Sequence, residues 1–304
     1  MAENHDTSHI VQSLVANLAI AAGKGVAAAF TGSGALLAET LHSGADCGNQ
    51  LLLLLGVRSA QKPADDSHPL GYGRSLYFWS FMVALLIFCG GGVFSVYEGW
   101  HKMGHPEAVS KPWIGFGILG FSLLLEGWAT LGNVRELRRR SGDLSLFRYL
   151  RSTKESDLVV VFGENSAAVL GLILAILSLA MVVITGNPWW DGVGSLAIGF
   201  VLIAVAIFLA IEVKSLLIGE AADPSIAEAA REEVEVDPDL EALISIVTVQ
   251  QGPGEVMVAV KVACRADLTA PEVAALIDRF EARLRARRPE AKWVFVEPGL
   301  HSTG

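Results

Sequence analysis

The sequence predicts an all-α bundle of six membrane-spanning helices, followed by a C-terminal α+β domain with a ferredoxin-like fold. Of the 304 residues, 52% are hydrophobic and only 18% are charged, whereas a soluble domain carries about 25% charged residues. The apolar residues gather in long runs, and a more polar region follows the last of them. A bilayer is therefore the expected solvent for most of the chain.

Six segments have the roughly 20 apolar residues that a helix needs to cross a bilayer. They are Ile10–Phe30, Ala35–Gly56, Tyr77–Trp100, Trp113–Leu131, Leu158–Thr185 and Val193–Lys214. The segments Thr31–Gly34 and Gly186–Gly192 contain helix-breaking Gly, Asn or Pro, so each predicts a tight hairpin. Residues 1–9 are then a polar N-terminal segment, and residues 10–214 form the membrane domain.

Basic residues are distributed unequally between the two sides of this layout. One side holds Arg58, Lys62, Arg74, Arg135, Arg138, Arg139, Arg140, Arg148, Arg151 and Lys154, and the other holds Lys102 and Lys111. Basic loops face the cytosol, so both termini are expected there. The N-terminus has neither the basic stretch of a secretory signal nor the features of a mitochondrial transit peptide. We therefore expect a multi-pass protein of a bacterial-type cytoplasmic membrane.

Residues 215–304 predict a small cytosolic domain with the element order αββαβ. Pro224–Val236 and Pro271–Arg288 read as helices, and Leu243–Gln250, Glu255–Arg265 and Trp293–Glu297 as strands. This order suits a ferredoxin-like domain with helices on one face of the sheet. Between Ala222 and Gly304 there are 15 acidic and nine basic residues, which argues against a nucleic-acid partner.

Ionisable residues inside the predicted spans are candidates for function, because a charge in hydrocarbon is costly. They are Lys24, Glu39, His42, Asp46, Glu126 and Glu164. Lys24 is expected to pair with Glu39 or another carboxylate, and Glu39 to reach toward the interface. Glu98 and Asp191 lie near predicted helix ends and are expected to be solvated.

His42 and Asp46 are four residues apart and therefore leave the same face of one helix. An imidazole nitrogen and a carboxylate oxygen make half of a tetrahedral zinc site, and Glu164 reaches a comparable depth on another helix. Two carboxylates neutralise a divalent cation, and without metal they are expected to take up protons, which compete for the same ligand atoms. A structural hydrogen bond is the alternative for the pair. Glu126 is a candidate proton relay, accessory ligand or structural partner.

Local sequences along the chain resemble the cation diffusion facilitator family. The second span and the loop after it carry AETLHSGADCGNQ (Ala38–Gln50) and DDSHPLGYGR (Asp65–Arg74). Similarity to the branch with the mitochondrial zinc exporter lies in LEGWATLGNVREL (Leu125–Leu137), GENSAAVLG (Gly163–Gly171) and ITGNPWWDGVGSLAIG (Ile184–Gly199). The ending WVFVEP (Trp293–Pro298) is similar to the end of the family's cytosolic domain.

The resemblance implies a homodimeric metal/proton antiporter with six spans and a ferredoxin-like cytosolic domain. The family builds its transport site from an [H/D]xxxD pair on the second helix, matched by His42 and Asp46, and an HxxxD pair on the fifth. A His at the first position goes with zinc preference. The second pair is absent, because Val161 and Asn165 occupy its positions. The expected metal ligands are therefore His42, Asp46, Glu164 and Asn165, with water or Glu126 completing the shell.

Two further metal sites of the family bear on this chain. Asp65 and His68 match an accessory surface site of some relatives, although the same residues also suit a turn. Many relatives carry a His-based metal cluster in the cytosolic domain, but no His occurs here between Ala222 and Leu300. We therefore expect no such cluster, and no resident cofactor, since the metal is cargo and protons are the counter-ion.

Zinc export from the cytosol is the leading interpretation, and the expected class is a transporter rather than an enzyme. A manganese or iron transporter is the alternative of the same fold, because carboxylate ligands favour harder metals. An intramembrane metal-dependent hydrolase would need an activated water and a base, and no HExxH sequence is present. A membrane scaffold or sensor whose soluble domain binds a cytosolic partner is a third possibility.

Overall fold

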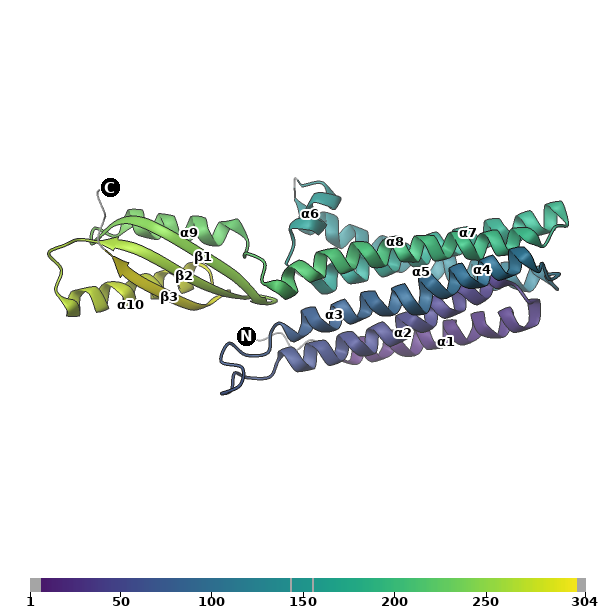
Figure 1. Ribbon diagram of the computed structural model, residues 1–304, viewed down its shortest axis with the longest axis horizontal. Helices are drawn as coiled ribbons and strands as arrows, with labels where there is room; N and C mark the ends of the chain where they lie inside the picture. The colour runs from purple at the N-terminus through teal and green to yellow at the C-terminus, as the bar shows by residue number, and fades with distance from the viewer. Residues whose placement is uncertain (1–6, 143, 155, 300–304) are drawn as a thin grey trace. The chain divides into compact units, whose positions relative to one another are not determined.

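The computed structural model describes residues 7–142, 144–154 and 156–299 (Figure 1). They form two compact units. The helical unit comprises residues 7–58, 78–142, 144–151 and 156–214, and the sheet unit comprises residues 59–77, 152–154 and 215–299. Residues 1–6 of the predicted polar N-terminal segment lie outside the described residues.

The helical unit is built from long helices that run side by side (Figure 1). They are α1 (Thr7–Thr31), α2 (Gly34–Ala60), a continuous segment of α3 (Ser75–Leu86), η1 (Ile87–Val93) and α4 (Phe94–Gly104), then α5 (Pro112–Ser141), α7 (Ser156–Thr185) and α8 (Trp189–Ile218). A short helix that the sequence did not predict, α6 (Leu146–Ser152), lies between α5 and α7. Each of the six predicted spans falls within one of the long segments.

Among the described residues, four helical segments are long and apolar enough to cross a membrane. They are Ser75–Gly104, Pro112–Ser141, Leu158–Thr185 and Trp189–Ile218. Helices α1 and α2 are 25 and 27 residues long, which at 1.5 Å per residue gives about 37 Å or more. They fall outside this set of four, and α2 carries Glu39, His42, Asp46 and Asn49 among its apolar residues.

Both predicted hairpins are present, but the second is shorter than the predicted Gly186–Gly192 because its last four residues belong to α8. Helix α1 ends at Thr31 and α2 begins at Gly34, and Gly32 between them has φ +67°. Helix α7 ends at Thr185 and α8 begins at Trp189, with Gly186 at φ +65°. A positive φ is strained for residues with a Cβ atom, so glycine suits both turns.

Glycines bring α4 and α8 into backbone contact. A Cβ atom at Gly99 would lie 2.5 Å from the nitrogen of Leu196 and 2.7 Å from the oxygen of Gly192. One at Gly199 would lie 2.9 Å from the oxygen of Gly92, which belongs to the π-helical turn η1. No side chain fits at these positions, so the two helices form a closely packed pair.

The sheet unit has the predicted order αββαβ: α9 (Pro224–Val236), β1 (Leu240–Gly252), β2 (Glu255–Cys264), α10 (Ala270–Arg287) and β3 (Ala291–Gly299). The sheet order is β1-β2-β3, with β1 antiparallel and β3 parallel to β2. Alternate residues of β2, from Val256 to Val262, join α9 and α10 in one core. The period-two alternation in the sequence reflects this half-buried sheet.

The connection between α2 and α3 belongs to the sheet unit and lies against its β1–β2 turn. A Cβ atom at Gly73 would lie 2.8 Å from the carbonyl oxygen of Gln251 and 3.2 Å from the Cα of Gly252. Only glycine permits this approach, which explains why position 73 of the HPLGYGR segment is a glycine.

Two valines of α9 test the core of the sheet unit. Val234→Ala should destabilise this unit by about 2 kcal/mol, because it removes two buried methyl groups and leaves a cavity. Val234 is 6% exposed, whereas Val236, two residues along the same helix, is 74% exposed. Val236→Ala makes the same chemical change and should leave stability unchanged when hydrogen–deuterium exchange of β2 peptides is followed through a denaturant titration. Equal losses in both variants would contradict the assigned core.

Candidate metal site in the helical unit

His42 and Asp46 of α2 lie on one helical face, as their spacing predicts. The Nδ1 atom of His42 is 3.7 Å from Oδ1 of Asp46. His42 is fully buried, and neither of its ring nitrogens has a hydrogen-bond partner among the described residues; the same holds for Oδ1 of Asp46. Buried polar atoms are normally hydrogen-bonded. These unused donor and acceptor atoms are therefore available to a further group.

Glu164 of α7 meets α2 at this point. Its carboxyl group is buried and interacts electrostatically with that of Asp46. Oε1 of Glu164 has no hydrogen-bond partner among the described residues. Two carboxyl groups from different helices thus interact, and one of them, that of Asp46, lies beside the buried imidazole of His42.

Asn49 is a polar residue of this region that the sequence analysis did not single out. It is fully buried and lies beside the Glu164 carboxyl group, but its side chain makes no hydrogen bond among the described residues. Its position could have been found, because residues 42, 46 and 49 share one face of a helix at i, i+4 and i+7.

Across the described residues, no three His, Cys, Asp or Glu side chains are gathered closely enough to hold a metal ion together. Asn165 is half-buried, and its backbone oxygen accepts a bond of 3.4 Å from the Thr130 hydroxyl of α5. None of the described contacts joins its side chain to His42 or Asp46. In this structure Asp46 neighbours His42 and interacts with Glu164, but no described contact adds the Asn165 side chain, so the predicted ligands do not form a closed cage.

Lys24 of α1 binds two carboxylates in the interior of the unit. Its Nζ atom lies 3.3 Å from Oε2 of Glu39, 2.8 Å from the hydroxyl of Ser43 and 2.9 Å from Oε1 of Glu126. The predicted ion pair with Glu39 is confirmed, and Glu126 of α5 is a second partner. Glu126 also interacts electrostatically with Asp46, so it connects Lys24 to the His42/Asp46 pair.

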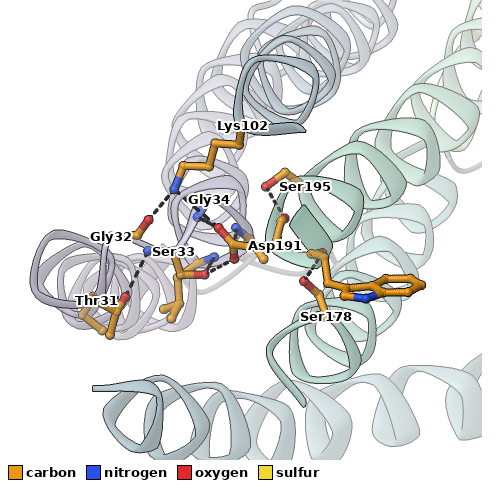
Figure 2. A network of polar contacts seen from close by, with 12 residues as sticks. Thr31, Gly32, Ser33, Gly34, Lys102, Ser178, Asp191 and Ser195 are labelled. Carbon is orange, nitrogen blue, oxygen red and sulfur yellow. Dashed lines mark hydrogen bonds and ion pairs between the residues drawn. The ribbon is translucent and has the colours of Figure 1, made fainter. Parts of the chain in front are cut away.

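Two expectations about individual carboxylates were wrong. Glu39 does not reach toward an interface: it is fully buried, because Lys24 supplies a partner and Gly171 of α7 leaves room for its carboxyl group. Asp191 is not solvated: it is 1% exposed and accepts hydrogen bonds from the first turn of α2 (Figure 2). Neither burial could be read from local sequence, since both partners are distant in the chain.

Asp65 and His68 lie in the connection between α2 and α3, within the sheet unit. The Asp65 carboxylate accepts bonds from the Ser67 backbone and hydroxyl, the His68 backbone and the Tyr72 hydroxyl, at 2.7–2.9 Å. The bonds from Ser67 and Tyr72 hold the pKa of Asp65 well below its usual range. The His68 ring packs against that of Tyr72 in a tilted arrangement, with ring centroids 4.1 Å apart. These contacts account for Asp65 as part of a turn.

Comparison with known proteins identifies the family. The model of the cation efflux transmembrane domain matches residues 10–218. The chain belongs to the cation efflux family. Members of this family are transporters and not enzymes, which removes the hydrolase alternative.

Relatives within the family differ in their named roles. The human proton-coupled zinc antiporter SLC30A9, mitochondrial, is 34% identical over 229 residues, 75% of this chain and 40% of the human protein. Metal tolerance protein C4 of Arabidopsis thaliana is 33% identical over 62% of this chain and 42% of its own length. Magnetosome protein MamB of Magnetospira sp. (strain QH-2) is 25% identical over 62% of this chain and 59% of its own. The chain thus spans about two fifths of the length of the antiporters it matches.

In this cation efflux protein, Lys24→Met tests the ion pairs that Lys24 forms with Glu39 and Glu126. Removing one partner of a buried ion pair typically costs about 3–5 kcal/mol, because the other charge stays buried and unpaired. The variant should melt at a clearly lower temperature than the wild type in the same detergent. Lys261→Met is the control, since its pair with Glu297 at 2.7 Å is exposed and contributes little. Equal melting temperatures for the two variants would show that Glu39 and Glu126 do not depend on Lys24.

Proposed function

We propose that this chain exchanges a divalent metal cation, foremost zinc, for protons across a membrane and exports it from the cytosol. The observation that carries the proposal is the interaction of Asp46 with Glu164 of another helix and with His42 of its own, because each of the three side chains has a buried polar atom without a hydrogen-bond partner among the described residues. Membership of the cation efflux family and the names of its proton-coupled zinc antiporters support the same reading.

The charges of this group fit a divalent cargo. A neutral imidazole and two carboxylates carry two negative charges in total, which neutralise a 2+ ion. When the ion leaves, two carboxylates remain close together in a dry interior, where repulsion disfavours keeping both charged. Because the ligands must lose their protons to bind metal, each loading step releases protons. Competition for the same atoms couples the two fluxes.

Zinc is favoured over harder metals by the imidazole, since nitrogen ligands suit zinc and oxygen ligands suit magnesium and manganese. No thiolate belongs to the group, which keeps binding weak enough for release. Asn165 and Glu126 are proposed as auxiliary ligands that approach when the ion is bound, with Glu126 an alternative proton relay. A manganese or iron cargo remains the second candidate, because carboxylates outnumber imidazoles.

We further propose that α1 and α2 also cross the bilayer, giving six spans, with residues 10–214 as the membrane domain. Their lengths suffice, and the ionisable residues that lower their hydropathy are paired or belong to the site. The basic connections would face the cytosol, with the sheet unit, taken as a ferredoxin-like domain, on the same side. A homodimer in a bacterial cytoplasmic membrane completes the proposal.

Asp46→Ala should abolish zinc transport into proteoliposomes, because it removes a charge from the proposed ligand set, while the protein still inserts and stays folded. Glu164→Gln should cause a severe loss for the same reason. Asp66→Ala is the control, because Asp66 is an exposed carboxylate twenty residues further along. Near-normal transport by the Asp46 variant, with the control also active, would refute the assigned site.

Metal-dependent pH change in sealed vesicles tests cargo and coupling together. With a pH-sensitive dye inside the vesicles, zinc added outside should enter and drive protons out, so the lumen becomes more alkaline. Manganese and magnesium should give a smaller response. Transport of manganese without zinc would select the second candidate, and zinc uptake with no proton movement would overturn the antiport mechanism. A chain that moves no metal but binds a cytosolic partner would favour the scaffold or sensor interpretation.

A further inference from the structure

Asp191 joins the start of α8 to the start of α2 (Figure 2). One of its carboxylate oxygens accepts from the Ser33 hydroxyl at 2.5 Å and from the Ala35 backbone nitrogen at 3.3 Å, and the other accepts from the Gly34 backbone nitrogen. The first backbone N–H groups of a helix have no partner within the helix. Asp191 therefore caps α2 from a neighbouring helix, and its charge faces the positive end of the helix dipole.

Helix α8 does not need Asp191 for its own start. The side chain of Asn187 accepts from the backbone nitrogen of Trp189 at 3.0 Å and caps α8 locally. Both carboxylate oxygens of Asp191 are thus directed to α2. Since Asp191 is 1% exposed, these donors take the place of the water molecules that would otherwise bind its carboxyl oxygens.

Lys102, in the last turn of α4, completes the connection. Its Nζ atom donates to the backbone oxygen of Gly32 in the α1–α2 hairpin and lies 3.4 Å from Oδ2 of Asp191. A Cβ atom at Gly34 would meet the Lys102 side chain at 2.6 Å and the Ser195 hydroxyl at 2.9 Å. The start of α2 is therefore seated tightly between α4 and α8.

Helices α4, α7 and α8, to which the start of α2 is attached, are connected to one another and are called the frame below. Helices α4 and α8 are joined by the glycine contacts at Gly99 and Gly199. Helix α7 is joined to α8, because the Ser178 hydroxyl donates to the backbone oxygen of Trp190 at 2.8 Å. This frame carries Glu164 on α7, whereas His42 and Asp46 lie on α2.

We propose that Asp191 is a positioning residue for transport: by anchoring the first turn of α2 to the α4–α7–α8 frame, it sets the position of His42 and Asp46 relative to Glu164. His42 and Asp46 lie eight and twelve residues beyond Gly34, which is about 12 Å and 18 Å along the helix. A stiff helix transmits a shift of its first turn to both residues. The inference rests on the proposed function, in which these three groups share the cargo.

The test measures zinc transport and backbone exchange on the same variants of the full chain. Asp191→Ala should raise the apparent KM for zinc about tenfold, in the range for residues that support metal ligands. Asp191→Asn keeps one acceptor oxygen, which can still accept from the Ser33 hydroxyl and from the Ala35 backbone N–H group. Its KM should therefore lie between those of Asp191→Ala and the wild type. Lys102→Met should resemble Asp191→Asn. Glu107→Gln is the control, because Glu107 is exposed on the connection after α4.

Hydrogen–deuterium exchange should show faster exchange in peptides covering residues 34–42 of Asp191→Ala, with peptides of β2 unchanged. An unchanged KM, or faster exchange throughout the chain with only the maximal rate reduced, would overturn the inference, since either result describes a purely structural role. A raised KM without faster exchange at 34–42 would also overturn it. A wild type that moves no zinc overturns the proposed function and this inference with it, whereas a transporting wild type matched by Asp191→Ala overturns the inference alone.

Discussion

Lys24 places an ammonium group among closely packed helices, where it reaches Glu39 and Ser43 of α2 and Glu126 of α5. An isolated charge in such an interior is prohibitively costly, and pairing is what makes it tolerable. The three helices α1, α2 and α5 are therefore held together by one cation and two carboxylates. Among the described residues no Lys or Arg forms an ion pair with Asp46 or Glu164, so these two carboxyl groups lie outside this pairing.

The contrast between paired and unpaired groups indicates where a mobile cation would bind. Lys24 offsets Glu39 and Glu126, and Lys102 offsets Asp191. His42, Asp46 and Glu164 retain polar atoms without partners among the described residues. A protein that carries a cation must leave some of its buried ligands unsatisfied when empty, and a proton is the natural substitute there. The same balance distinguishes a transport site from a permanent structural metal site.

Helix packing supplies the rigid background for these polar groups. Glycines allow the backbones of α4 and α8 to touch, with no side chains between them at these positions. Such close packing holds the two helices together as a rigid pair. Helix α2 is held differently, through polar bonds at its start and ion pairs in its middle. Because hydrogen bonds need a defined distance and angle, those at its start fix the first turn of α2 against the frame.

The sequence by itself determined the long helices, their hairpins and the order αββαβ, because hydrophobic periodicity and helix-breaking residues are local properties. It also placed His42 and Asp46 on one face, since i and i+4 are neighbours on any α-helix. Only the tertiary structure decided which carboxylates are buried, and it brought Glu126 to Lys24, Glu164 beside Asp46 and Asn49, and Asp191 to the start of α2. These pairings join residues 102 to 157 positions apart. No local pattern encodes them, because the free energy of a buried charge depends on neighbours that only the packed helices bring together.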